Sequence, residues 1–202
     1  MLKDGIFSKS NLKRGLNTIS GMQNPAQERS DTLRILDGAC RLLEEGMAGP
    51  LVPDSGSNIA YALRGARSVT DVAAVTGGLH ARKGVVRRSG EVAFGAEEWI
   101  AGTLLTVMKF DPAVRSAVRI QYSEKVYRIL SDIFMECTTI RGKDNPAAAG
   151  LMDFTIAACC NDEVPDVIAV IGPAPESRVI WLFGEEPALL ASNIIILSNR
   201  IE

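Results

Sequence analysis

The sequence predicts an α/β or α+β fold, from three observations. Segments with a strand-like pattern alternate with segments whose apolar residues recur at helical spacing. The 202 residues are enough for one domain of ordinary size with a substantial core. No internal repeat or low-complexity segment interrupts the alternation. We therefore expect one domain at residues 30–202, preceded by an irregular arm at residues 1–29.

The arm is rich in Ser, Asn, Gly and Lys, and has room for one short helix at residues 11–19. It is too short for a complete helix-turn-helix domain. A longer helix is expected at residues 30–47, where Leu33, Leu36, Cys40 and Leu43 recur at helical spacing. Ser30 or Asp31 would cap its start, and Gly46 would end it.

The central segment predicts a strand at 57–63, and then two strands at 71–78 and 84–90 joined through "HARKG". A helix is expected from Ala96 to Met108, with Trp99 in its apolar stripe and with Glu97 and Glu98 in its first turn. A short helical turn at 111–117 should follow. The remaining expected strands are 118–123, 135–140, 165–172 and 177–184, and the remaining helices are 124–134, 145–160 and a last one from about 185.

Composition argues against several classes of function. The formal net charge is -2, which gives no support for a generic DNA-binding or membrane-surface protein. No apolar run reaches membrane-spanning length, and the basic N-terminus lacks the apolar segment of a signal peptide, so we expect a cytoplasmic protein. The four cysteines (Cys40, Cys137, Cys159 and Cys160) fit no zinc or redox spacing and are expected to be reduced thiols.

Two turns have the chemistry of phosphate binding. "PDSGSNI" at 53–59 offers hydroxyl and amide donors, which suit a phosphate or a polar heterocycle. "FGAEEWIA" at 94–101 places a glycine before a helix, where backbone N–H groups face an anion. Taken alone, each motif is by default ordinary turn chemistry.

His80 is the chain's one histidine, so neither a Ser–His pair of the usual kind nor a His-cluster metal site can be built elsewhere. It lies between a glycine pair and a basic run, and it is either structural or functional. By default the basic run is the solvated edge of a hairpin; it comprises Arg82, Lys83, Arg87 and Arg88.

Taken together and in order, these pieces resemble the ThiN family, the archaeal-type thiamine-phosphate synthase domain. The resemblance begins near residue 33 and continues to the end of the chain. The matching segments are "LVPDSGSNIAYAL", "SVTDVAAVTGG", "FGAEEWIAGTLLTVMKFDPAVRSAVRIQYS", "VPDVIAVIG" and "IWLFG".

The resemblance implies a fold and a reaction. ThiN domains are three-layer α/β/α structures with a mixed, largely antiparallel sheet, related to AraD-type aldolases. They join a hydroxymethylpyrimidine diphosphate to thiazole phosphate and release pyrophosphate, which requires groups that accept the departing negative charge. In the family an arginine after the glycine of the "AV" strand and a histidine at a helix start serve this purpose.

Both family positions differ in this sequence. Gly78 stands at the position of the family's arginine, and Trp99 stands at the position of the family's histidine. Two small hydroxyl residues before the histidine become Glu97 and Glu98, whose carboxylates would repel a diphosphate. An asparagine of the family becomes Arg119, and a "GST" segment is replaced by "AAAG" at 147–150. Trp99 either continues the apolar stripe of its helix or offers a face on which a cationic ring stacks.

We therefore expect a diverged ThiN-like domain that binds thiamine phosphate or a related thiamine-pathway phosphate without synthase activity, in a sensor or regulatory role. Regulators with such domains carry a DNA-binding domain, which this chain lacks in recognisable form; Lys9, Lys13 and Arg14 are thin support for nucleic-acid binding by this chain alone. The expected ligand-binding residues are Asp54, Ser55, Gly56, Ser57, Asn58, Gly77, Gly78, Phe94, Gly95 and Trp99.

The alternative is an active thiamine-phosphate synthase. His80, Arg82 and Arg115 would then be the candidates for charge stabilisation. His80 and Arg82 would share a strand face with Gly78 and could replace the missing arginine only if the strand register shifted. No cofactor or bound metal is expected, although Mg²⁺ would accompany a diphosphate substrate. The expected partner is a small phosphorylated ligand; we expect no membrane contact and allow for a homodimer.

Overall fold

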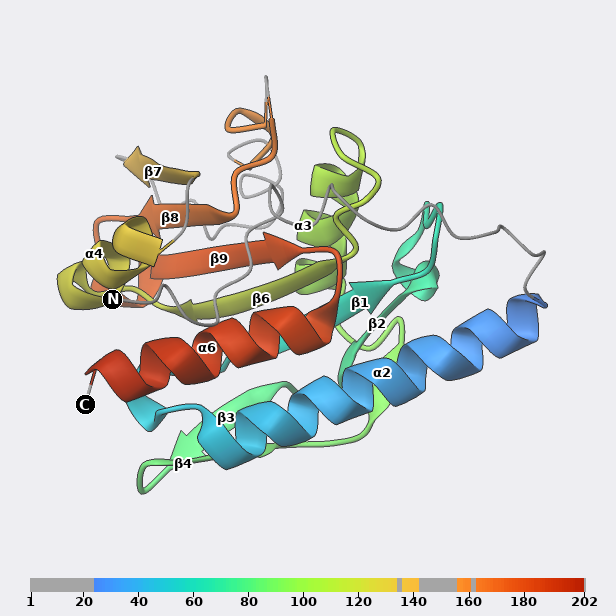
Figure 1. The fold of residues 1–202 in the computed structure, drawn as a ribbon, viewed down its shortest axis with the longest axis horizontal. Coiled ribbons are helices and arrows are strands. Elements are labelled where there is room, and N and C mark those ends of the chain that lie inside the picture. The colour runs from blue at the N-terminus through green and yellow to red at the C-terminus, as the bar shows by residue number, and fades with distance from the viewer. Residues whose placement is uncertain (1–23, 134–135, 142–155, 161–162, 202) are drawn as a thin grey trace, which may run out of the picture.

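A seven-stranded sheet forms the centre of the protein (Figure 1). The computed structural model describes residues 24–133, 136–141, 156–160 and 163–201. The strand order is β5-β2-β1-β6-β9-β8-β7, and of these pairings only β7 with β8 is parallel. The strands are β1 (Asn58–Ala62), β2 (Val72–Val75), β5 (Val92–Phe94), β6 (Ser116–Gln121), β7 (Cys137–Arg141), β8 (Val167–Ile171) and β9 (Arg178–Gly184).

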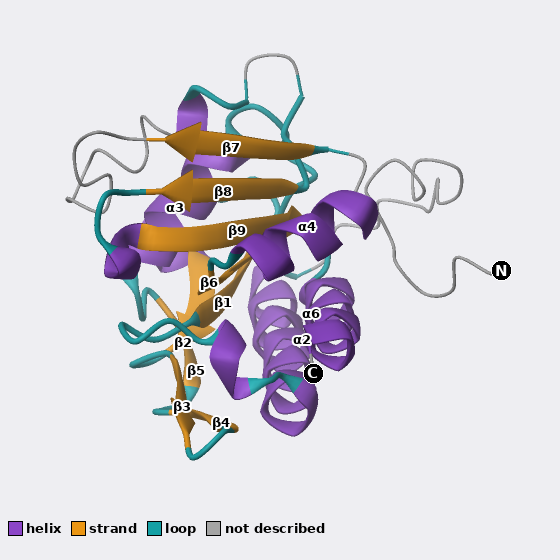
Figure 2. Cartoon of the chain, turned by 90° about the vertical axis from the view of Figure 1, so that its left-hand side faces the viewer, coloured by secondary structure: helices purple, strands orange, loops and turns teal. Residues whose placement is uncertain are grey.

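Helices cover both faces of this sheet (Figure 2). One face carries α2 (Pro25–Gly46), α4 (Glu124–Ile133) and α6 (Pro187–Ile201), which contribute to one buried apolar cluster with Leu36, Leu130 and Ile194 among its members. The other face carries α3 (Glu98–Met108), which contributes Ile100 and Leu104 to a second cluster. The three-layer α/β/α architecture and the mixed, largely antiparallel sheet are thus confirmed.

Helix α2 begins five residues earlier than predicted. Asn24 is its N-cap, accepting a hydrogen bond at its side-chain oxygen from the Ala26 N–H, and Pro25 occupies the first turn, where its missing N–H costs nothing. Residues 25–29 are therefore helical and not irregular. The helix proposed at 11–19 lies outside the described residues, as does most of the helix proposed at 145–160.

The segment around the glycine pair differs from the prediction. Strand β2 ends at Val75, and Gly77 and Gly78 both adopt positive φ angles (72° and 75°), which extended strand backbone does not allow. The "LHAR" segment then forms β3 (Leu79–Arg82), which pairs with β4 (Val85–Arg88) in a separate two-stranded sheet. Gly78 lies outside β3, so the strand face expected to join it to His80 and Arg82 does not exist.

Smaller differences concern element ends. Helix α3 begins two residues later than predicted, and β6 begins two residues earlier, at Ser116. The helical turn expected at 111–117 is a non-helical turn that leads directly into β6, and the short strand β5 was not predicted. The remaining strands and helices agree with the prediction to within a few residues.

The hairpin β3–β4 is fixed to helix α2 by ionic contacts. Arg88 pairs with Asp37 through Nη1 and with Glu44 through Nε, at 3.4 Å. The basic run is therefore not wholly a solvated edge, because one of its arginines anchors the hairpin. Within the described chain, no helix combines the length and apolar character needed to cross a membrane.

Candidate functional site

The candidate site lies at one end of β1 and β6, on the face of the sheet that α3 covers. Arg119 of β6 is directly opposite Asn58 on β1 and Trp181 on β9. Asn58 is completely buried and bonds to the backbone of β2: its Nδ2 donates to Val75 O at 2.8 Å, and its Oδ1 accepts from Val75 N at 3.1 Å. This side chain therefore holds the end of β2 beside β1, and positions the glycine pair that follows.

The "DSGSN" turn is hydrogen-bonded to Arg119. The Nη2 atom of Arg119 donates to Ser55 Oγ at 3.1 Å and to Gly56 O at 2.6 Å. Ser57 Oγ donates to the backbone carbonyl of Arg119. Gly56 has φ 87°, and a Cβ there would come within 2.8 Å of the His80 ring. The turn, Arg119 and His80 are thus brought together.

The glycine pair packs against the same turn. A Cβ on Gly78 would lie 2.6 Å from the Ser57 carbonyl oxygen, and the positive φ would strain it further. An arginine therefore does not fit at Gly78 in this backbone. Beside it, the carbonyl of Gly77 is 2.9 Å from His80 Nε2.

Glu97 and Trp99 complete the cluster. Glu97 is the N-cap residue of α3, but its carboxylate accepts no capping hydrogen bond from the backbone of that helix. Instead Oε1 accepts from the Gly77 N–H at 2.8 Å, and Oε2 accepts from Trp99 Nε1 at 3.1 Å. The centroid of the Trp99 ring is 5.8 Å from the centroid of the Trp181 ring, and the two rings meet edge to face.

Arg119 has no carboxylate partner within the described part of the chain. Its guanidinium carbon lies 4.1 Å from the centroid of the Trp99 ring, and its Nε is buried with no hydrogen-bond acceptor among the described residues. Burial lowers the pKa of Arg119 to about 10, so it stays charged at neutral pH. Trp181 Nε1, on the residue directly opposite, is also buried without a described acceptor.

Several predicted residues lie elsewhere. Phe94 is on the opposite face of the sheet, where its ring lies 3.8 Å from the guanidinium carbon of Arg29. The Gly95 N–H bonds to Val72 O at 3.0 Å and is not free for a ligand. Arg82 is exposed near the tip of the hairpin.

Arg115 is also remote, at the other end of the β1–β6 pairing. It is only 7% exposed, and both its Nε and Nη2 donate to Ala62 O, at 3.0 and 2.8 Å. Its guanidinium carbon lies 4.5 Å from the centroid of the Tyr61 ring. These contacts hold Arg115 within the β1–β6 end of the sheet, apart from the Arg119 cluster.

Sequence reasoning did not include Arg119 or Glu97 among the ligand-binding residues. The available signal was the predicted replacement of family residues at both positions. What the sequence could not show is that both side chains contact the same indole ring, since that requires the tertiary fold.

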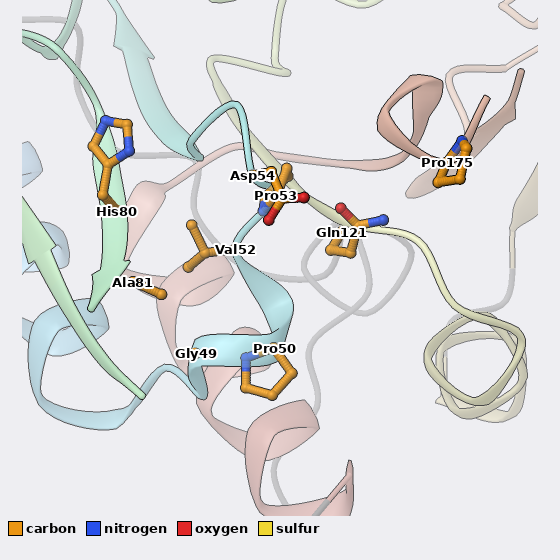
Figure 3. Close-up of a pocket in the computed structure, with 9 residues that line it drawn as sticks. All are labelled: Gly49, Pro50, Val52, Pro53, Asp54, His80, Ala81, Gln121 and Pro175. Atoms are coloured by element: carbon orange, nitrogen blue, oxygen red, sulfur yellow. The ribbon is translucent and has the colours of Figure 1, made fainter. Parts of the chain in front are cut away.

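A cavity of about 440 Å³ adjoins the cluster (Figure 3). Strand β3 forms one wall with His80 and Ala81, the 49–54 segment forms another, and Gln121 and Pro175 lie across from them. Asp54, the first residue of the predicted turn, lines this cavity and not the Arg119 cluster. Among the described residues, no group of three or more His, Cys, Asp or Glu side chains is arranged to hold a metal ion.

Solved structures of other proteins share this fold. The C-terminal domain of protein MJ0236 superposes with a TM-score of 0.77 at 28% identity, over 86% of this chain and 96% of that one. The C-terminal domain of a phosphomethylpyrimidine kinase gives 0.71 at 28% identity, over 83% of this chain and all of that one. An aldolase II superfamily protein from Pseudomonas syringae gives 0.51 at 9% identity, over 87% of this chain and 75% of that one, a likeness of fold alone.

The family follows from the sequence match. The model of the thiamine-phosphate synthase ThiN family matches residues 35–196, and the chain belongs to that family. The bifunctional thiamine biosynthesis protein ThiDN of Methanocaldococcus jannaschii is 29% identical over 203 residues. That alignment covers 98% of this chain and 47% of ThiDN, so the chain spans about half the length of this relative.

Proposed function

We propose that this ThiN domain binds thiamine phosphate, or a related phosphate of the thiamine pathway, at Arg119 and acts as a sensor without synthase activity. The observation that carries the proposal is the partly buried guanidinium of Arg119, which has an unpaired Nε and no carboxylate partner among the described residues. Removing a cation from water is costly unless an anion compensates it, and a phosphate matches the planar guanidinium donors well.

The surroundings of Arg119 fit a phosphorylated ring. Ser55 Oγ, which accepts a hydrogen bond from Arg119, has a hydroxyl hydrogen to donate to a phosphate oxygen. Trp99 is 37% exposed, so part of its surface is open to a ligand ring. An aromatic face favours a cationic heterocycle such as a thiazolium.

The same cluster argues against synthesis. Loss of a diphosphate leaving group requires cationic groups that stabilise the departing charge. Among the described contacts, Arg119 is the one arginine or lysine side chain that touches Trp99 or the Ser55–Gly56 turn, whereas the Glu97 carboxylate accepts a hydrogen bond from the Gly77 N–H. In addition, the backbone leaves no space for a side chain at Gly78.

The binding test is a calorimetric titration of the purified chain with thiamine phosphate. Arg119→Met should weaken binding about tenfold or more, because hydrogen bonds to a charged group contribute roughly 1.5–3 kcal/mol each. Arg128→Met is the matched control: it removes the same charge from an exposed position on α4 and should leave the affinity unchanged. Wild-type protein that fails to bind, or an Arg119→Met protein that binds equally well, contradicts the proposal.

An active synthase is the second candidate, and the position of His80 favours it. This side chain lies against Gly56, its Nε2 is 2.9 Å from the Gly77 carbonyl oxygen, and it borders the cavity, so it could stabilise charge on a ligand there. The test supplies the pyrimidine diphosphate, thiazole phosphate and Mg²⁺. Product that disappears in His80→Ala but persists in Arg128→Met would establish this candidate in place of the first.

A further inference from the structure

The carboxylate of Glu97 lies in a position suited to an anionic ligand. Two donors from separate segments, the Gly77 N–H and the Trp99 indole N–H, converge on its two oxygens at 2.8 and 3.1 Å. A phosphoryl group presents the same pair of adjacent acceptor oxygens. The Gly77 donor follows β2 and the indole donor belongs to α3, so only the folded protein brings them together.

The indole of Trp99 links this carboxylate to the unpaired cation. Its Nε1 edge donates to Glu97, while the guanidinium of Arg119 lies over its face. Arg119 itself is bonded to the Ser55–Gly56 turn and not to Glu97. A ligand phosphate held by Arg119 therefore comes close to a fixed negative charge that already occupies the neighbouring donors.

We propose that Glu97 is an internal competitor that sets the charge preference of this site, favouring a monophosphate over a diphosphate. The inference rests on the proposed function. A second phosphate needs the Gly77 and Trp99 donors that Glu97 occupies, and it brings further negative charge toward the carboxylate, which repels it. A single phosphate is satisfied by Arg119 and Ser55 without displacing Glu97.

The test compares affinities for thiamine phosphate and thiamine diphosphate by calorimetry. Glu97→Gln keeps the shape and removes the charge, and it should tighten diphosphate binding by roughly tenfold but monophosphate binding by no more than about threefold. Glu97→Ala removes the competing acceptors as well and should show at least the same change. The alanine variant also shows whether the change comes from loss of the carboxylate or from the new glutamine side chain.

Glu98→Gln is the matched control. Glu98 is the next residue, is exposed, and makes no hydrogen bond or ion pair described in the structure, so its removal changes the net charge equally. An equal gain in diphosphate affinity for Glu98→Gln would overturn the inference, because the effect would then be general electrostatics.

The outcomes also separate this inference from the proposed function. If wild-type protein binds thiamine phosphate but Glu97→Gln leaves the preference unchanged, the inference is wrong and the function stands. If Glu97→Gln weakens binding of both ligands, Glu97 is a direct ligand contact and the inference is wrong. If neither wild-type nor Glu97→Gln binds either ligand, both proposals are wrong.

Discussion

The guanidinium carbon of Arg119 lies 4.1 Å from the centroid of the Trp99 ring. The resemblance to ThiN predicts that both residues are replacements, Arg119 of an asparagine and Trp99 of a histidine. In the structure the indole of Trp99 covers the partly buried cation of Arg119. The predictions below follow from this pair and from its surroundings.

We expect the Arg119–Trp99 contact to contribute measurably to stability. In a double-mutant cycle with Arg119→Met and Trp99→Leu, the coupling free energy should be about 0.5–2 kcal/mol, the range of cation–π pairs from exposed to desolvated. Urea unfolding of the four proteins measures it. Strictly additive effects would show that the two side chains do not interact.

Arg115 should behave in the opposite way to Arg119. Arg115→Met removes two hydrogen bonds to the Ala62 carbonyl and a contact with Tyr61, so we expect a loss of about 2–3 kcal/mol in the free energy of unfolding. The ligand affinity of the folded fraction should be unchanged. Denaturant unfolding together with calorimetry checks both parts, and a folded Arg115→Met protein that no longer binds would return Arg115 to the site.

The glycine at 78 should resist any side chain. Gly78→Ala should be destabilised by about 3 kcal/mol or more, since both its positive φ and the Ser57 carbonyl oppose a Cβ. Gly84 has φ 80° with open space around it, so Gly84→Ala should cost only the ~1–2 kcal/mol of the left-handed backbone. Thermal or urea unfolding of the two variants should therefore differ, and equal losses would refute the steric argument.

The ion pair between Asp37 and Arg88 should make the fold sensitive to acid. The hydrogen bond from Arg88 lowers the pKa of Asp37 in the folded state. The ion pair therefore stabilises the fold fully above pH 3.8, the ordinary pKa of the carboxyl group. This stabilisation is lost as the pH falls through the lower pKa that Asp37 has in the folded state. Asp37→Asn should be less stable than wild type at neutral pH, and the difference should shrink in acid.

Urea unfolding at neutral pH and well below pH 3.8 measures this change. Glu45→Gln removes an exposed carboxyl from the same helix and should keep the wild-type response. A difference between Asp37→Asn and wild type that does not depend on pH would contradict the assignment.

Much of the fold could be predicted because apolar periodicity and turn residues agree along the chain. Strands β1, β8 and β9 are apolar runs between turn residues. The end of α2 could be predicted because Gly46 itself is a residue that ends helices. The end of β2 was misplaced because Gly77 and Gly78 read equally well as strand or as turn, and only their positive φ angles decide.

The sequence displays some residues of the candidate site and not others. The Ser55–Asn58 turn and Trp99 belong to contiguous motifs that a sequence displays. Phe94 lies on the other face of the sheet from the cluster, and the sequence does not show which face a strand residue joins. Arg119 and Glu97 were omitted because their importance depends on contacts between strands and helices far apart in the chain.

The most direct test of binding without synthesis is a product assay on the sample whose thiamine phosphate affinity has been measured. The purified chain would receive the pyrimidine diphosphate, the thiazole phosphate and Mg²⁺, and thiamine phosphate would be detected by chromatography. We predict no product above the control without protein, although the same sample binds thiamine phosphate. Product formation by this sample would contradict the sensor account and would assign the chain as a working synthase.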